Sequence, residues 1–222
     1  NSLVEKFKTA LTSTAKVISD DLQLNENNKK KTDNSINIEI DNLTKPSDFI
    51  KLRAETDSVA LKKKFSNKDI YKNNLPTNPS SRSLYKIAEK IRYECLGGKM
   101  LKGIEKNFNE NYKEIINRTR KEKLRNKEDV AVTEAFELYM LKNFHHIELN
   151  TLTRRMLNFW EKDFEKSIDK HKKFLQDNLD NQQQYSSRFS KILEEMDICQ
   201  HEDNNEEKED NQDQGQDNPS ND

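Results

Sequence analysis

The stretch from Asn78 to Tyr112 constrains the fold most, because two amphipathic segments follow each other there almost without a break. Apolar residues three and four positions apart form one helix face. The first segment has this spacing at Leu84, Ile87, Ala88, Ile91 and Cys95, and the second has it at Leu101, Ile104, Phe108 and Tyr112. We therefore expect two helices that fold back on each other or turn a corner, with the rest of the chain packed on them.

The ends of the first segment also carry helix signals. Asn78 suits an N-cap and Pro79 suits the first helical position. Gly97 and Gly98 predict the helix end, since glycine readily takes the left-handed conformation that stops a helix.

Composition favours long helices over a sheet-rich fold, because the 222 residues include only 4 glycines and 4 prolines. Helical spacing recurs in the segments 2–19, 47–61, 79–96, 101–116, 131–144, 151 to 170 or 175, and 180–196. We expect three of these segments to be capped by Ser47, by Asn150 or Thr151, and by Asp180. These segments predict a mainly α domain of about six helices. The polar stretch 53–58 allows a kink, and residues 69–71 suggest one helical turn within a connection.

One short segment reads as a strand. Residues 36–40 alternate strictly between apolar and polar side chains. We expect them to pair with residues 22–24 in one small β-hairpin near the N-terminus, which needs a helix beneath it. The predicted core joins two sets, Phe136, Met140, Leu157, Trp160, Phe189 and Ile192 against Leu84, Ile87, Ile91, Leu101, Ile104 and Phe108.

Charge divides the chain into a body and a tail. Residues 201–222 contain nine acidic residues and one lysine, a net charge of −8, so the total of −1 leaves +7 for residues 1–200. We expect one helical domain over 1–200 and a disordered acidic linker over 201–222. Three interpretations stay open: a partner for each part, a tail that shields the body, or a solvated surface followed by a linker.

Two cysteines far apart, Cys95 and Cys199, give no disulfide framework, so a reducing cytoplasm is expected. Cys95 lies on an apolar stripe and is expected in the core. Neither a signal peptide nor an apolar run long enough for a membrane span is found. Because the sequence lacks an initiator Met and stops inside a low-complexity tract, we expect a part of a longer protein.

No catalytic, cofactor or metal site is predicted. Gly97-Gly98-Lys99 lacks the first glycine and the Ser/Thr of a phosphate loop. The pair His145-His146 with Glu148 offers ligands but no placed third one, so surface histidines at a helix end are the preferred interpretation. Residues 33–37 begin like a metal-adhesion motif but supply only part of it.

Two further features have competing interpretations. A basic run could bind phosphate backbones, although it lacks interleaved aromatic residues and contains Glu122: Arg118, Arg120, Lys121, Lys123, Arg125 and Lys127. A solvated helix end is the preferred interpretation. The pair Phe159-Trp160 is expected in the core rather than as a ligand shelf.

The central stretch and its flanks resemble the T subunit of the aerobic, ATP-dependent cobaltochelatase. The likeness rests on a signature at Arg92, Glu94, Leu96, Gly97, Gly103, Ile104 and Asn107. Residues 57–61, the opening helix at 11–18, the region 156–160 with Trp160, and residues 189–197 before the acidic tract are similar too. Leu101 stands where the family pattern has Met, and Met100 lies one position early.

The resemblance implies a helical N-terminal region that precedes an acidic linker and a von Willebrand A domain. The complex would use ATP, Mg and Co(II) to insert cobalt into hydrogenobyrinic acid a,c-diamide during cobalamin biosynthesis. The implied partners are an AAA+ ATPase S subunit, a large chelating N subunit and further copies in a ring. This region would be a non-catalytic platform, with its signature residues structural and no cofactor bound. A basic nucleic-acid-binding or scaffold domain with an autoinhibitory acidic tail is the alternative, and the missing aromatics disfavour nucleic acid.

Overall fold

The computed structural model describes residues 2–19, 43 and 45–196, and these residues are helical apart from short connections. Nine α-helices and one 3₁₀ turn lie in the described ranges: α1 (Ser2–Ile18), α2 (Pro46–Phe65), α3 (Lys68–Asn73), α4 (Pro79–Met100), α5 (Lys102–Arg118), η1 (Lys127–Asp129), α6 (Val132–Phe144), α7 (Thr151–Asn158), α8 (Glu161–Asp177) and α9 (Gln182–Glu195). The prediction of a mainly α fold is confirmed. The hairpin expected at 22–24 and 36–40 and the acidic tail lie outside the described residues, and the described ranges contain no strand.

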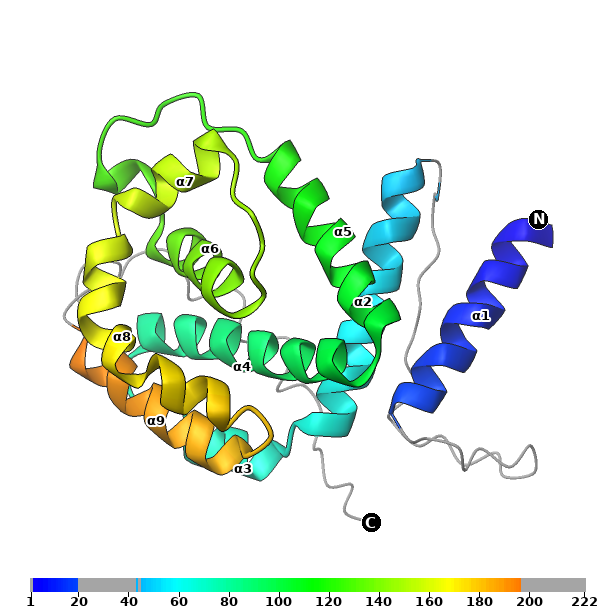
Figure 1. Cartoon of the computed structure of the whole chain (residues 1–222), viewed down its shortest axis with the longest axis horizontal. Helices are drawn as coiled ribbons and strands as arrows, with labels where there is room; N and C mark the ends of the chain where they lie inside the picture. The colour runs from blue at the N-terminus through cyan, green and yellow to red at the C-terminus, as the bar shows by residue number, and fades with distance from the viewer. Residues whose placement is uncertain (1, 20–42, 44, 197–222) are drawn as a thin grey trace, which may run out of the picture.

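Helix α4 forms the centre of the fold, with α2, α5, α6 and α9 packed against it (Figure 1). Its Asn78 cap accepts a hydrogen bond from the Ser80 amide, and Pro79 opens the helix, as predicted. Helices α7 and α8 extend the layer beside α6, and α3 packs on α9.

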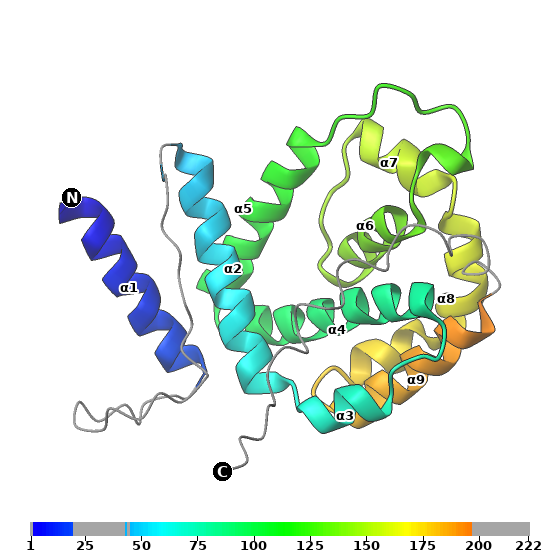
Figure 2. The same ribbon diagram turned by 180° about the vertical axis from the view of Figure 1, so that it is seen from behind.

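Helix α1 lies on the far side of α2 from the other helices in both views (Figures 1 and 2). It packs extensively on α2 alone among the described helices. Leu11, Ala15 and Ile18 are buried, and the Phe7 and Phe49 rings meet edge to face at 5.0 Å. This amphipathic helix is therefore joined to the described fold mainly through one neighbour.

The expected end of the first central helix is wrong. Helix α4 continues through Gly97 and Gly98 to Met100, and no described glycine has a positive φ. Gly97 instead allows close packing: a β-carbon there would lie 2.3 Å from Leu61 Cδ1 on α2. The turn between the central helices falls at Leu101, whose extended backbone caps both α4 and α5.

Three smaller expectations also change. Helix α2 runs unbroken through residues 53–58, and Asp48 accepts from the Lys45 amide at its start, so Ser47 is not the cap. The segment 151–170 divides into α7 and α8 at Phe159 and Trp160, which raises the helix count. Asn181, not Asp180, caps α9.

The predicted core is mostly confirmed. Phe136, Met140, Leu157, Phe189, Ile192, Leu84, Ile91, Ile104 and Phe108 are buried, and Ile87 and Trp160 pack against them partly buried. Leu101 is 48% exposed because it occupies the corner between two helices, so its place in the core was wrongly predicted. Every helix that the structure describes is too short or too polar to span a lipid bilayer.

Candidate functional site

Most of the signature residues gather at one corner, where α2, α4 and α5 meet. Arg92, Glu94, Leu96 and Gly97 lie on the C-terminal half of α4, and Gly103, Ile104 and Asn107 lie on the first turns of α5. Residues 57–61 of α2 face both helices, through three contacts that pair Asp57 with Asn107, Ser58 with Glu94, and Leu61 with Gly97. We call these six residues the corner cluster.

Glu94 is the most densely bonded side chain of the corner cluster. Ser58 Oγ donates to its Oε1 over 2.6 Å, the Tyr112 hydroxyl donates to its Oε2, and His145 Nε2 lies 3.3 Å from Oε2. The carboxylate thus links α2, α4, α5 and the end of α6. Such a buried network fixes the relative positions of these helices, because each unsatisfied member would cost a desolvation penalty.

The surroundings of Glu94 favour its ionised form. Burial by itself opposes ionisation, but the hydrogen bond with His145 and the charge of Lys90 outweigh it and lower the pKa of Glu94 below its ordinary value. Burial, together with the Glu94 charge, raises the pKa of Tyr112 well above its ordinary range, so this hydroxyl stays a donor. Burial also raises the pKa of Glu137, although the Lys90 charge opposes the shift.

A carboxylate, an imidazole and a hydroxyl in contact resemble an acid–base constellation, but a substrate cannot reach them. The Glu94 side chain is 2% exposed and that of His145 is 7% exposed. A general base must come within hydrogen-bond reach of a substrate proton. The arrangement therefore acts as an internal support in this conformation.

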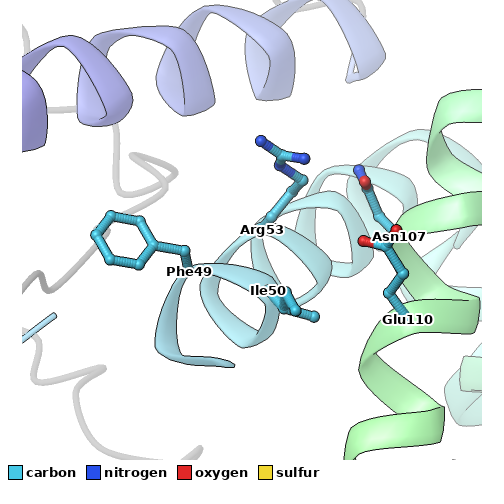
Figure 3. Close-up of a pocket in the computed structure, with 5 residues that line it drawn as sticks. All are labelled: Phe49, Ile50, Arg53, Asn107 and Glu110. Carbon is cyan, nitrogen blue, oxygen red and sulfur yellow. The ribbon is translucent and has the colours of Figure 1, made fainter. Parts of the chain in front are cut away.

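The Asp57–Asn107 pair borders the one cavity that we describe at this corner. Asn107 Nδ2 donates to Asp57 Oδ2 over 2.7 Å, and burial raises the pKa of Asp57 against this bond and the nearby Arg53 charge. The cavity measures about 150 Å³. Helix α2 supplies Phe49, Ile50 and Arg53 to its lining, and α5 supplies Asn107 and Glu110 (Figure 3). Arg53 and Glu110 carry opposite charges, so the lining offers no net charge to an ion.

Arg92 belongs to a second buried group, between α4 and α9. Its guanidinium is 1% exposed and donates from Nε to Glu89 Oε2 over 2.8 Å, and to the carbonyl oxygens of Phe65 and Leu179. Gln182 Nε2 also donates to Glu89 Oε1, over 2.9 Å. The bonds of Arg92 thus join the end of α2, α4 and the loop before α9.

Leu96 and Ile104 support the corner through apolar contact, since Ile104 is buried and Leu96 packs partly buried against the core. Gly103 is open, because a β-carbon there would meet nothing within 4 Å.

Trp160 lies away from the corner, at the junction of α7 and α8. Its Nε1 donates to the Val130 carbonyl over 3.0 Å, and its ring stacks on Phe164 at 14°. Lys127 Nζ lies 4.0 Å from the ring centroid and 2.6 Å from Asp163 Oδ2. These contacts fill the ring's surroundings with the protein's own groups, in line with the expected packing role.

The basic run between α5 and α6 is partly balanced by carboxylates of neighbouring helices. Arg118 Nη2 lies 3.3 Å from Glu114 Oε2, and Lys121 Nζ lies 2.9 Å from Glu134 Oε2. Arg120 donates to two carbonyl oxygens of its own loop. Three of the six cations of this run, Arg118, Lys121 and Lys127, are thus paired with carboxylates.

The expectation of two surface histidines is wrong for His145. It turns inward to Glu94 and lies against the Phe108 and Tyr112 rings, at centroid distances of 5.9 and 5.4 Å. His146 is exposed and has φ 57°, which turns the chain sharply after α6. Among the described residues, no three His, Cys, Asp or Glu side chains are grouped to hold a metal ion. Cys95 is buried, as predicted.

The buried network was missed from sequence. Glu94, Ser58 and Tyr112 lie on three different helices, so the sequence shows which helix face each occupies but not that they meet. A charged residue on the apolar side of a helix was the available signal.

Comparison with known proteins gives one family. The family model described as cobalamin biosynthesis protein CobT matches residues 1–222. Comparisons with curated proteins and with solved structures found no match.

Proposed function

The chain belongs to the CobT family of cobalamin biosynthesis proteins, and from this premise we propose that it is the assembly and coupling region of an ATP-dependent cobaltochelatase T subunit. In this proposal the complex inserts Co(II) into hydrogenobyrinic acid a,c-diamide. The AAA+ S subunit hydrolyses ATP with Mg, and the large N subunit holds the tetrapyrrole. The chain itself binds no cofactor and works in the cytoplasm.

The proposal of a non-catalytic role rests on one observation, namely that the signature residues contact other residues of the same chain. Asp57, Ser58, Glu94 and Asn107 satisfy one another inside the helix corner, and the Gly97 position is filled by Leu61. The buried carboxylates among them, Asp57 and Glu94, are unavailable to a substrate, whereas Asn107 also lines the cavity. A corner held by hydrogen bonds and close packing is suited to transmit force between subunits, because packed helices move as rigid bodies.

The S subunit is the partner that tests this proposal most directly. The full chain is mixed with the AAA+ subunit of the same source, with Mg–ATP or without nucleotide, and is analysed by size-exclusion chromatography and ATPase rate. We expect nucleotide-dependent co-elution in a ring-sized species and a changed ATPase rate. Failure to co-elute with Mg–ATP present would contradict the proposal.

A matched pair of glycine variants links assembly to the corner cluster. Gly97→Ala places a methyl group against Leu61, whereas Gly103→Ala places one in open space. If the corner transmits coupling, Gly97→Ala should weaken the ATPase response while Gly103→Ala preserves it. If both variants are folded at the assay temperature and give equal ATPase responses, the corner cluster does not take part in the coupling.

A further inference from the structure

Two parts of the body carry a clear excess of positive charge, namely residues 62–90 and the loop 118–127, which has six lysines and arginines against Glu122. Residues 62–90 contain eight lysines and arginines against two acidic residues, a net charge of +6, whereas residues 1–200 as a whole carry +7. This segment comprises the end of α2, all of α3 and the first half of α4, which follow one another continuously along the chain (Figure 2).

Five cations of this segment form what we call the basic strip: Lys62, Lys68, Lys72, Arg82 and Lys86. All five are exposed, and within the described ranges none has a carboxylate partner. Arg82 donates only to the Pro76 carbonyl. The loop 118–127 differs in part, because half of its six cations are paired with carboxylates among the described residues: Arg118, Lys121 and Lys127.

The described chain ends beside this strip. Helix α9 runs antiparallel to α4, so that Gln182 contacts Glu89 while Leu193 reaches Ser81 at the other end. Glu194 Oε1 accepts from the Thr77 amide over 3.3 Å, and Met196 is buried. The last described residue thus lies near the first turn of α4, which is the turn that carries Arg82.

The acidic segment begins within reach of that point. Four residues separate Met196 from residue 201, so the Cα atoms of these two positions lie at most about 18 Å apart. The following 22 residues carry −8. Because the tether makes the encounter intramolecular, exposed charge pairs that are individually weak act at a high effective concentration.

We propose that the basic strip is the docking surface for residues 201–222 of the same chain, which compete there with any acidic partner. The negative charge of residues 201–222 complements the positive charge of the strip, and the end of α9 places the start of this segment near the strip. The loop 118–127 is the less favoured surface, because carboxylates of α5, α6 and α8 pair with half of its six cations and the described chain ends beside α4 instead. The contact is electrostatic and weakens steeply with added salt.

Paramagnetic relaxation in the full chain tests the proposal. A nitroxide is attached to Asn211→Cys in a Cys199→Ser background, where burial, which raises the pKa of the Cys95 thiol to about 12, keeps that thiol unlabelled. We expect loss of amide intensity in α3 and the first half of α4 at low salt. The same amides should recover in high salt.

Two charge-matched variants decide where the segment binds. One replaces the five cations of the basic strip with Gln, and the other replaces Arg118, Arg120, Lys121, Lys123 and Arg125 with Gln. Intensity loss should disappear in the first variant and persist in the second. The proposal would be overturned if the amides of the strip kept their full intensity at low salt. It would also be overturned if their intensity loss persisted in the strip variant, or if both surfaces lost intensity equally.

A competition measurement adds the functional consequence. A fluorescent poly-glutamate peptide should bind more tightly when the nine acidic residues of 201–222 are replaced with Asn or Gln in the full chain. Unchanged peptide affinity in that variant would refute competition at the strip. These results do not depend on whether the AAA+ subunit co-elutes.

Discussion

The contact of Gly97 with Leu61 gives the sharpest stability prediction. An added β-carbon would lie 2.3 Å from Leu61 Cδ1 and 2.7 Å from Cδ2, and Leu61 is fully buried, so α2 and α4 must shift or Leu61 must leave its rotamer. Overpacking of this kind costs about 1–3 kcal/mol. Replacing a glycine with alanine inside a helix stabilises the folded state by roughly 1 kcal/mol through helix propensity. Gly97→Ala should therefore range from near neutral to about 2 kcal/mol less stable.

Gly103→Ala is the control, because it has the same chemistry without the contact. It should gain roughly 0.5–1 kcal/mol. The two variants should thus differ by about 1–3 kcal/mol, which corresponds to several degrees in Tm at about 2–4 °C per kcal/mol. Urea unfolding followed by far-UV circular dichroism measures the difference.

Alanine at position 97 would also be unfavourable if Gly97 ended the helix, so a second substitution is needed to show that the contact with Leu61 is the cause. Leu61→Ala removes the atoms that the new methyl group strikes, so Gly97→Ala should be less costly in the Leu61→Ala background. A double-mutant cycle should give a favourable coupling of about 0.5–3 kcal/mol. Additive effects would refute the close contact, and so would equal stabilisation by Gly97→Ala and Gly103→Ala.

Three other predictions use the buried polar groups. Arg92→Met leaves the Glu89 carboxylate buried without its cation and should cost about 3–5 kcal/mol in urea unfolding; a cost under about 1 kcal/mol would contradict the pairing. Because the folded pKa of Glu94 is lowered, its contribution to stability is present above the unfolded pKa and is lost as pH falls through the folded one. Glu94→Gln should therefore flatten the acid side of the stability–pH curve, and an unchanged slope would count against this assignment. Burial raises the pKa of the Cys95 thiol to about 12. In a Cys199→Ser chain, Cys95 should therefore react with a thiol reagent no faster than the chain unfolds, and rapid labelling of the folded chain would disprove its burial.

Local signals in the sequence predicted the helices well. The apolar stripe through Leu84, Ile91 and Cys95 is buried, and Asn78 and Asn150 cap helices as expected. These features depend on neighbours three or four residues away, which a single sequence displays. The family also followed from short motifs in the right order, and the family model matches the whole chain.

Features that depend on distant partners were not predictable in the same way. Gly97 was interpreted through its backbone freedom, whereas its environment is set by Leu61, which lies 36 positions earlier on α2. His145 was placed on the surface because its partner Glu94 lies 51 positions away. The single helix expected from residue 151 divides at Trp160, whose indole donates to the distant Val130 carbonyl. In each case a tertiary contact outweighed local propensity.

The attachment of α1 mainly to α2, among the helices that the structure describes, has a consequence for the order of unfolding. Detaching α1 would break the Phe7–Phe49 contact and expose Leu11, Ala15 and Ile18, yet it would leave the hydrogen bonds of Glu94 and Arg92 intact. The amides of α1 should thus exchange with deuterium through a partial opening, at a lower free energy than those of α4. The molecule then has two tiers of cooperativity, an outer helix that opens by itself and an inner bundle that opens as a whole.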